Sequence, residues 1–159
     1  MTFEMAMNAQ QLKRLFSWYG PFLGAGVKIE RIDDNWRYCK VAMRLRWYNR
    51  NAVDVHFGGS LYSMVDPHYM LLLMKCLGPE YTVWDKAASI EFVRPGKGYV
   101  YAEFKITDEI LEDIRKHTAN GEKYLPVLPV EVKGEDGQVV CRVEKTLYIR
   151  RGKQSGVRI

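Results

Sequence analysis

The stretch between Gly58 and Leu77 is the strongest constraint on how this chain folds. It reads GGSLYSMVDPHYMLLLMKCL and is apolar on nearly every side when it is drawn as a helix, with Gly78-Pro79 as its stop signal. A helix that is apolar all round has to be enclosed by other structure. The stretch is also interrupted by ionisable residues and too short to span a bilayer, so no membrane partner is expected. We therefore predict a long central helix over about residues 58–77, kinked at Pro67.

About six β-strands are predicted around this helix. The clearest covers residues 38–48, where Cys39, Val41, Met43, Leu45 and Trp47 alternate with more polar neighbours, as in an antiparallel sheet with one solvated face. The other strands are expected at 27–33, 82–94, 99–107, 124–133 and 139–150. Short helices are expected at 9–19 and 108–118.

These elements predict an α+β fold in which a curved antiparallel sheet wraps around the central helix. Either a second subunit or the curvature of the sheet covers the remaining side of the helix. The alternative is an α+β sandwich of another topology, because periodicity does not determine strand order. The length of 159 residues suits one domain over 1–159, with a helical extension at 1–25 and a basic tail at 151–159.

Charge and cysteine content restrict the partners. A net charge of +5 could attract nucleic acid or a phosphorylated ligand such as coenzyme A, but the basic residues form no dense stripe. A soluble surface with a basic tail is favoured, and no nucleic-acid partner is expected. The three cysteines have no paired spacing, which argues against disulfides and against a metal site. No cofactor is indicated. The first residues lack a signal-peptide pattern, so a cytoplasmic location is expected.

The start of the predicted central helix carries most of the candidate chemistry. Gly58 and Gly59 allow the backbone to approach a ligand closely, and the first amides of a helix can stabilise an oxygen that acquires negative charge. A simple loop-to-helix turn is the plainer alternative. Asp66 lies about two turns into the apolar helix, where a carboxylate needs a partner or a cavity. It is therefore a candidate general base or nucleophile beside the Pro67 kink.

This segment resembles the hotdog-fold acyl-CoA thioesterases of the phenylacetyl-CoA and 4-hydroxybenzoyl-CoA type. Asn51, Phe57-Gly58-Gly59 and Asp66 follow the pattern N-x5-H-G-G-x6-D, except that Phe57 stands where the family has histidine and His56 is displaced by one residue. The resemblance is most specific over 56–98, which is similar to an uncharacterised family placed among the hotdog thioesterases. It implies a hotdog fold with two or four subunits and a site between them.

The resemblance also implies roles for individual residues. The amide of Gly58 or Gly59 would polarise the thioester carbonyl, Asp66 would be the base or nucleophile, and Asn51 would position water. Ser89 takes the place of a polar residue that reaches the site from the partner subunit. Contacts with the substrate are expected from His56, Phe57, Met64, Phe92 and Arg94.

Two functions are compatible with these residues. The first is hydrolysis of an acyl-CoA or an acyl-carrier thioester, and the alternative is non-catalytic binding of an acyl group or lipid, with Phe57 as the mark of lost chemistry. Hydration of an enoyl thioester would need a histidine paired with a carboxylate, and no such pair is evident. Asp85 and Lys86 are adjacent in a strand, so one of the two charges must point inward. A strand-end ion pair is the simplest interpretation, and a role in lining the acyl channel is the weaker alternative.

Overall fold

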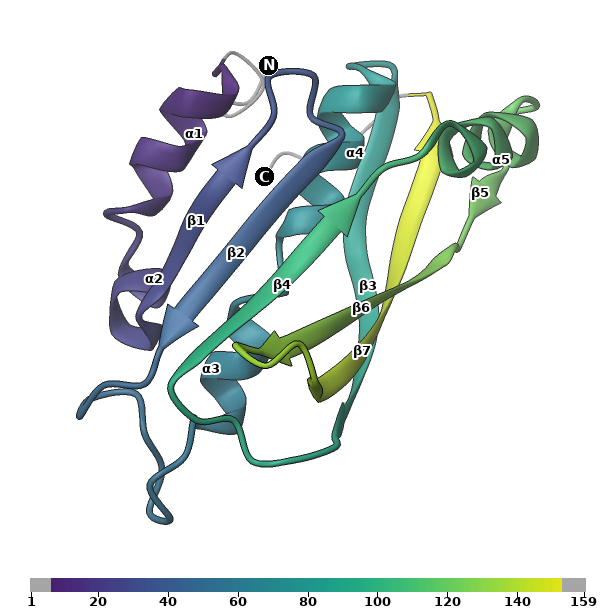
Figure 1. The fold of residues 1–159 in the computed structure, drawn as a ribbon. Coiled ribbons are helices and arrows are strands. Elements are labelled where there is room, and N and C mark those ends of the chain that lie inside the picture. The colour runs from purple at the N-terminus through teal and green to yellow at the C-terminus, as the bar shows by residue number, and fades with distance from the viewer. Residues whose placement is uncertain (1–6, 153–159) are drawn as a thin grey trace.

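One antiparallel sheet curls around two consecutive helices (Figure 1). The structure is a computed structural model that describes residues 7–152. The predicted basic tail therefore lies outside the described residues from 153 onward, as do the first six residues of the helical extension. The helices are α1 (Ala9–Phe16), α2 (Gly20–Ala25), α3 (Gly58–Ser63), α4 (His68–Leu77) and α5 (Asp108–Thr118). The strands are β1 (Val27–Ile32), β2 (Tyr38–Arg44), β3 (Tyr81–Phe92), β4 (Tyr99–Lys105), β5 (Lys123–Tyr124), β6 (Val127–Gly134) and β7 (Val139–Arg151).

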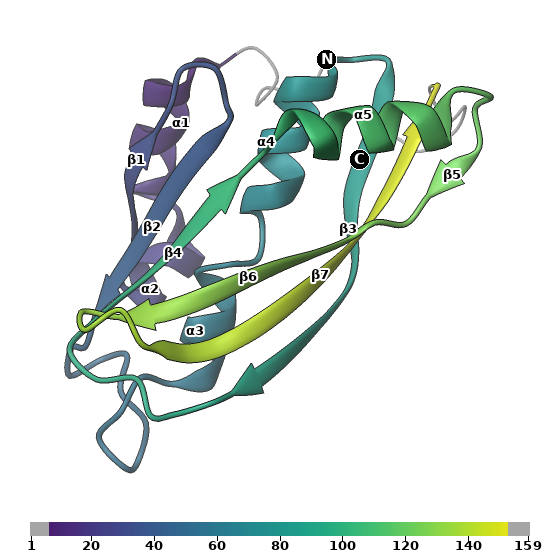
Figure 2. The ribbon, with the colours of Figure 1, turned by 45° about the vertical axis from the view of Figure 1, so that its right-hand side comes forward.

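The strands lie in the order β1-β2-β4-β6-β7-β3, and the short β5 pairs with β7. Every pairing is antiparallel. The sheet bends so that α3 and α4 lie on its concave side, while α1 and α2 flank β1 and α5 lies at the end near β5 (Figures 1 and 2). This arrangement confirms the predicted α+β class, with a curved antiparallel sheet around a central helical segment. It makes β1 and β3 the two edges of the sheet.

The central helix is not continuous, and the prediction of one long helix over 58–77 was wrong in this respect. Helix α3 ends at Ser63, four residues of turn follow, and α4 begins at His68. Proline has no amide hydrogen, so Pro67 cannot donate to the Ser63 carbonyl, and the helical ladder is interrupted there. The predicted kink is therefore a full break, and Asp66 lies within it.

The core lies between the concave face of the sheet and α4. Leu72 and Leu73 of α4 are buried against inward residues of the strands, among them Val100, Ala102 and Phe104 of β4. His68 is fully enclosed, with its ring 5.0 Å from Phe104 and 5.7 Å from Phe22. Burial lowers the pKa of His68 to about 3, so the ring is neutral. His68 is therefore a core residue.

The expected strand at 38–48 is shorter than its alternation indicated. Cys39, Val41 and Met43 are buried as predicted, but β2 ends at Arg44 and Trp47 is 81% exposed. The chain turns away because the buried side chain of Asn49 donates to the carbonyls of Ala25 and Arg44 and accepts from the Arg46 amide. These three bonds begin the loop that leads to α3.

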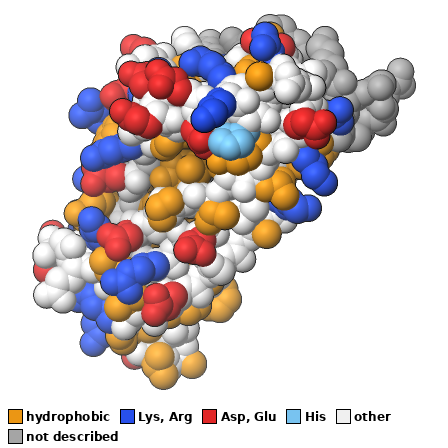
Figure 3. All heavy atoms as spheres, turned by 90° about the vertical axis from the view of Figure 1, so that its right-hand side faces the viewer, with side chains coloured by type: hydrophobic (Ala, Val, Ile, Leu, Met, Phe, Trp, Pro, Cys, Tyr) orange, Lys and Arg blue, Asp and Glu red, His pale blue; other side chains and the backbone are white. Residues whose placement is uncertain are grey.

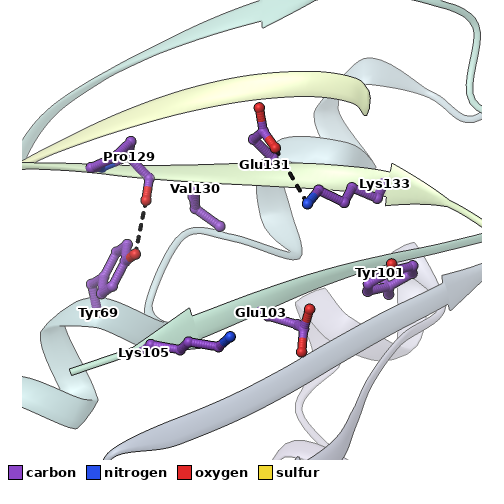
Figure 4. A pocket seen from close by; sticks show the side chains of 8 residues that line it. All are labelled: Tyr69, Tyr101, Glu103, Lys105, Pro129, Val130, Glu131 and Lys133. Atoms are coloured by element: carbon purple, nitrogen blue, oxygen red, sulfur yellow. Dashed lines mark hydrogen bonds and ion pairs between the residues drawn. The ribbon is translucent and has the colours of Figure 1, made fainter. Parts of the chain in front are cut away.

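Strands β4 and β6 pair only over Val100–Ala102 and then diverge. Figure 4 shows the resulting opening, where the Tyr69 side chain of α4 reaches the backbone of β6. Its hydroxyl donates to the Pro129 carbonyl at 2.8 Å, which gives that carbonyl the partner that β4 does not supply. The opening holds a cavity of about 420 Å³ lined mainly by charged and tyrosine side chains of β4 and β6.

The surface shows no large region of one charge on the face that carries α5, β6 and β7. Acidic and basic side chains are interspersed there with hydrophobic ones (Figure 3). Within residues 7–152, no helix is both long and apolar enough to cross a bilayer.

Candidate active site

Asp66 is the most unusual acidic residue of the concave side, because one of its oxygens is engaged and the other is open. Its side chain is 48% exposed. The Tyr62 hydroxyl donates to Asp66 Oδ1 at 2.8 Å, and the Lys145 ammonium donates to the same oxygen at 2.9 Å. No hydrogen bond from the described residues reaches Oδ2. The carboxylate is thus held from one side and presents a free oxygen on the other.

Lys145 is the residue around which this cluster is organised. It lies in β7 at an inward position between Val143 and Leu147, and its side chain is only 1% exposed. Its Nζ atom lies 2.9 Å from Asp66 Oδ1 and 3.0 Å from Asp85 Oδ1. A buried ammonium costs several kcal/mol of desolvation unless it is paired, and here two carboxylates share it.

A β-bulge in β3 brings Asp85 into the cluster. Asp85 pairs with Leu147, but the next pair is Ala87 with Thr146, so Lys86 is an extra residue in β3. A bulge of this kind re-aims the side chains around it. Asp85 points inward toward Lys145, and Lys86 is exposed. The simple interpretation of Asp85-Lys86 as a strand-end ion pair is therefore wrong, since the partner of Asp85 is the buried Lys145.

The charges of the cluster follow from burial and from these contacts. Burial opposes ionisation of Asp66, but the bonds from Lys145 and Tyr62 outweigh it and hold the pKa of Asp66 below its usual value. Burial also opposes the charge on Lys145, yet the bonds to Asp66 and Asp85 raise its pKa above the usual value. Asp85 is the more deeply buried carboxylate, and burial raises its pKa despite the contact with Lys145. At neutral pH Asp66 and Lys145 are both ionised.

Asp66 lines a cavity of about 460 Å³, which we call the Asp66 cavity. Its floor is formed by α3, the turn and α4, and its opposite wall by α1, α2 and the residues between them. The floor residues are Gly59, Tyr62, Ser63, Asp66, Pro67, Met70 and Leu71, and the wall residues are Leu15, Phe16, Tyr19, Pro21 and Phe22. A concave, mostly apolar cavity with a few convergent polar groups is the usual form of a small-molecule site.

Several other predicted site residues meet in a second cavity, on the far side of the start of α3. This cavity measures about 430 Å³, and the predicted residues that line it are Asn51, His56, Gly58, Phe92 and Arg94. Asn51 Oδ1 accepts from the amides of Val53 and Val55, so it shapes the loop before α3. His56 is buried with Nε2 3.0 Å from the Gly98 carbonyl, and burial lowers its pKa.

Arg94 is held by the hairpin between β6 and β7. Its guanidinium donates to the Asp136 carboxylate at 2.6 Å and to the carbonyls of Gln138 and Val139. These bonds direct the guanidinium toward the hairpin and away from Asp66. The polar groups that line the second cavity are therefore different from those around Asp66.

The two glycines lie against neighbouring aromatic rings. A Cβ atom on Gly58 would lie 2.9 Å from the Phe92 ring, and one on Gly59 would meet the Phe57 ring. Gly59 lines the Asp66 cavity, whereas Gly58 lines the second cavity. Phe57 is the N-cap residue of α3 and is 56% exposed. The glycines thus separate the two cavities at the start of α3.

Two predicted site residues lie away from both cavities within one subunit. Met64 is completely buried in the core. Ser89 of β3 is exposed and pairs with Glu144, which is also exposed, so both side chains lie on the outer face of the sheet. Ser89 could therefore contribute to a site only through contact with another subunit.

Sequence reasoning missed Lys145 and Tyr62, and it considered Asp85 only as half of the Asp85-Lys86 pair. The alternation of β7 contained a signal for Lys145, because a lysine at an inward position of a central strand must find a buried acid. Residues 7–152 contain no group of three or more histidine, cysteine or acidic side chains placed to hold a metal ion.

Comparison with solved structures identifies the fold. PA5026 from Pseudomonas aeruginosa, described as a protein of unknown function and probable thioesterase, aligns with a TM-score of 0.80 and 19% identity over 94% of this chain and 99% of that chain. Thioesterase HI1161 from Haemophilus influenzae aligns with a TM-score of 0.69 and 15% identity over 99% of this chain and 100% of that chain. The Escherichia coli PaaI protein, from the phenylacetic acid degradation operon, aligns with a TM-score of 0.58 and 17% identity over 87% of this chain and 95% of that chain.

At these identities the likeness establishes the fold, and it confirms the hotdog resemblance of the central segment. Comparison of the sequence with curated proteins gives no significant match. Residues 8–149 match the family model described as Domain of unknown function (DUF4442). The match spans most of the chain, and we conclude that this protein is a hotdog-fold member of the DUF4442 family.

Proposed function

We propose that this protein hydrolyses acyl thioesters at Asp66, with acyl-CoA or an acyl-carrier protein as the source of the thioester. The observation that carries the proposal is the ionised Asp66 carboxylate, which lines a cavity and has one oxygen held by Lys145 and Tyr62. A hydrolase needs such a group to activate water or to attack the carbonyl carbon itself. The descriptions of PA5026 and HI1161 as thioesterases support the same reaction class.

In this reaction a water oxygen bonds to the thioester carbon, directly or after Asp66 has attacked it. The carbon–sulfur bond breaks, a proton passes to the thiolate, and a carboxylic acid and a thiol are released. The Gly58 and Gly59 amides would stabilise the carbonyl oxygen, and Asn51 would orient water. His56, Phe57, Phe92 and Arg94 remain proposed substrate contacts, of which His56, Phe92 and Arg94 line the second cavity. Met64 is not among them, because its side chain is completely buried in the core.

A panel of acyl-CoA substrates of different chain length tests the proposal. We expect the purified protein to release free thiol from at least one of them. An Asp66→Ala variant that retains its fold but turns over the same substrates at the wild-type rate would exclude the mechanism. Binding of acyl-CoA without any turnover would instead favour the non-catalytic acyl-binding function, which the exposed Phe57 in place of a histidine supports.

The pH dependence of the reaction should reflect the pairing of Asp66 with Lys145. Because the folded-state pKa of Asp66 lies below its usual value of 3.8, the carboxylate stays ionised as the pH falls toward that value. We therefore expect the part of kcat/KM that depends on Asp66 to be flat from about pH 5 to 7. In Lys145→Met the pKa of Asp66 should rise, so the rate should decline on the acidic side. The same dependence of kcat/KM on pH below about pH 5 in the wild type and in Lys145→Met would contradict the role of Lys145 in lowering the pKa of Asp66.

We also infer that two copies of the chain associate along β3. This strand is an edge of the sheet, pairs only with β7 among the described strands, and exposes Lys86, Ala87, Ala88 and Ser89. A long edge strand that is not covered is a ready site for pairing with another chain. Such pairing is the arrangement through which Ser89 of one subunit could approach the site of another. Light scattering should give the mass of two or four chains, and a fully active monomer would contradict the inference.

A cytoplasmic location is part of the proposal. The three cysteines are free thiols, which suits a reducing compartment.

A further inference from the structure

The N-terminal helices form one whole wall of the Asp66 cavity. Leu15 and Phe16 of α1, Tyr19 between the helices, and Pro21 and Phe22 of α2 face the floor that carries Asp66. Leu15 and Tyr19 are 40% and 47% exposed, although both have large apolar side chains. Exposed apolar side chains gathered around a cavity mark a surface that meets an apolar ligand or partner.

The lining of this cavity changes character along the central helical segment. The polar groups come from α3 and the turn, namely the Tyr62 and Ser63 hydroxyls and the Asp66 carboxylate. Beyond Asp66 the floor continues with Pro67, Met70 and Leu71, and the opposite wall is apolar or aromatic. These floor residues line the cavity together along the length of the segment, from Gly59 of α3 to Leu71 of α4. One end of the cavity is suited to a polar, reacting group and the other to a hydrocarbon.

We propose that the Asp66 cavity binds the acyl chain of the thioester, and that α1 and α2 set the chain length it accepts. This proposal rests on the proposed hydrolysis at Asp66. The thioester carbon lies at the polar end beside Asp66, and the hydrocarbon chain runs between Met70 and Leu71 on the floor and Leu15 and Phe16 on the wall. Burial of the apolar chain away from water is favourable, whereas a polar acyl group would lose hydrogen bonds to water against a wall that is mostly apolar.

Two exposed leucines of the N-terminal helices provide a matched test. Leu15 lines the Asp66 cavity, whereas Leu23 of α2 is 52% exposed and does not belong to its lining. Tryptophan at position 15 adds volume inside the cavity, and tryptophan at position 23 adds the same volume elsewhere on the same pair of helices. The full-length wild type, Leu15→Trp and Leu23→Trp should be compared with butyryl-, octanoyl- and palmitoyl-CoA, together with their melting temperatures.

We expect Leu15→Trp to lower the ratio of kcat/KM for the longer substrates to kcat/KM for butyryl-CoA at least tenfold, and Leu23→Trp to leave this ratio unchanged. The same chain-length profile in both variants, at equal melting temperatures, would overturn the proposal.

If the wild type hydrolyses none of the substrates, the proposed reaction is wrong. Calorimetry with octanoyl-CoA then tests separately whether the Asp66 cavity binds the acyl chain. Weaker binding in Leu15→Trp than in Leu23→Trp would then support the acyl site without catalysis. Equal binding in the two variants would overturn it.

Discussion

Replacing Lys145 with methionine should lower the free energy of unfolding by about 3–5 kcal/mol, because it removes the cation from a buried cluster and leaves Asp85 without a partner. Methionine fills a similar volume, so the loss reports the charge rather than a cavity. Asp66 is half exposed and regains water, which places the larger share of the loss at Asp85, whose side chain is 23% exposed. Urea denaturation of the two proteins at neutral pH measures the difference.

Arg142 provides the control for this variant on the same strand. Arg142 lies three residues before Lys145 in β7, on the opposite, exposed face of the strand. The N–O distances of its ion pairs with Glu91 and Glu131 are 3.5 Å. Exposed pairs of this kind contribute about 0–1 kcal/mol, so Arg142→Met should change stability little. A double variant, Asp85→Asn with Lys145→Met, should recover part of the lost stability because it also removes the unpaired charge. Equal decreases in the free energy of unfolding for Lys145→Met and Arg142→Met would show that the buried cluster stabilises the fold no more than an exposed ion pair does.

Asp66→Asn should reduce kcat by about 10²–10⁴-fold with little change in KM, which is the range expected when a general base is removed. Asparagine keeps the size of the side chain and an oxygen for Tyr62 and Lys145, but it can neither take a proton nor attack a carbonyl. Release of free thiol from the best acyl-CoA substrate measures the rate. Melting temperatures show whether the fold is retained.

Asp54→Asn is the matched change at an exposed carboxylate. Asp54 pairs with Arg50 in the loop before α3, and its side chain is 78% exposed. We expect this variant to keep the wild-type rate. A loss of activity of similar size in both variants would indicate a general effect of the charge on substrate binding, and the role of Asp66 would have to be abandoned.

The elements of this fold could be predicted largely from local patterns. The inward positions of Cys39, Val41 and Met43 followed from alternation, and α5 occupies the predicted residues 108–118. Errors arose where a local pattern met a long-range constraint. The alternation that includes Trp47 continues past the point where Asn49 ends the strand by bonding to Ala25, which lies 24 residues earlier in the chain. The break at Pro67 has a local cause instead: a kink was predicted there from the missing amide hydrogen, and the structure shows a full interruption of the helix.

For the site, the sequence by itself determined the carboxylate at Asp66, the glycines before it and the apolar segment that must be buried around them. Only the tertiary structure decided what Asp66 contacts. Lys145 is 79 residues away along the chain, and the pairing of β3 with β7 and the bulge at Lys86 bring Lys145 and Asp85 together on the concave side. Leu15 and Phe16 of α1 line the same cavity as Asp66 although about 50 residues separate them along the chain, because α1 packs against β1 of the sheet that encloses the central helices. Periodicity in the sequence predicts which side chains point inward. A buried charge is stable only beside a partner of opposite charge, and which residue becomes that partner depends on how the strands pair across the whole sheet.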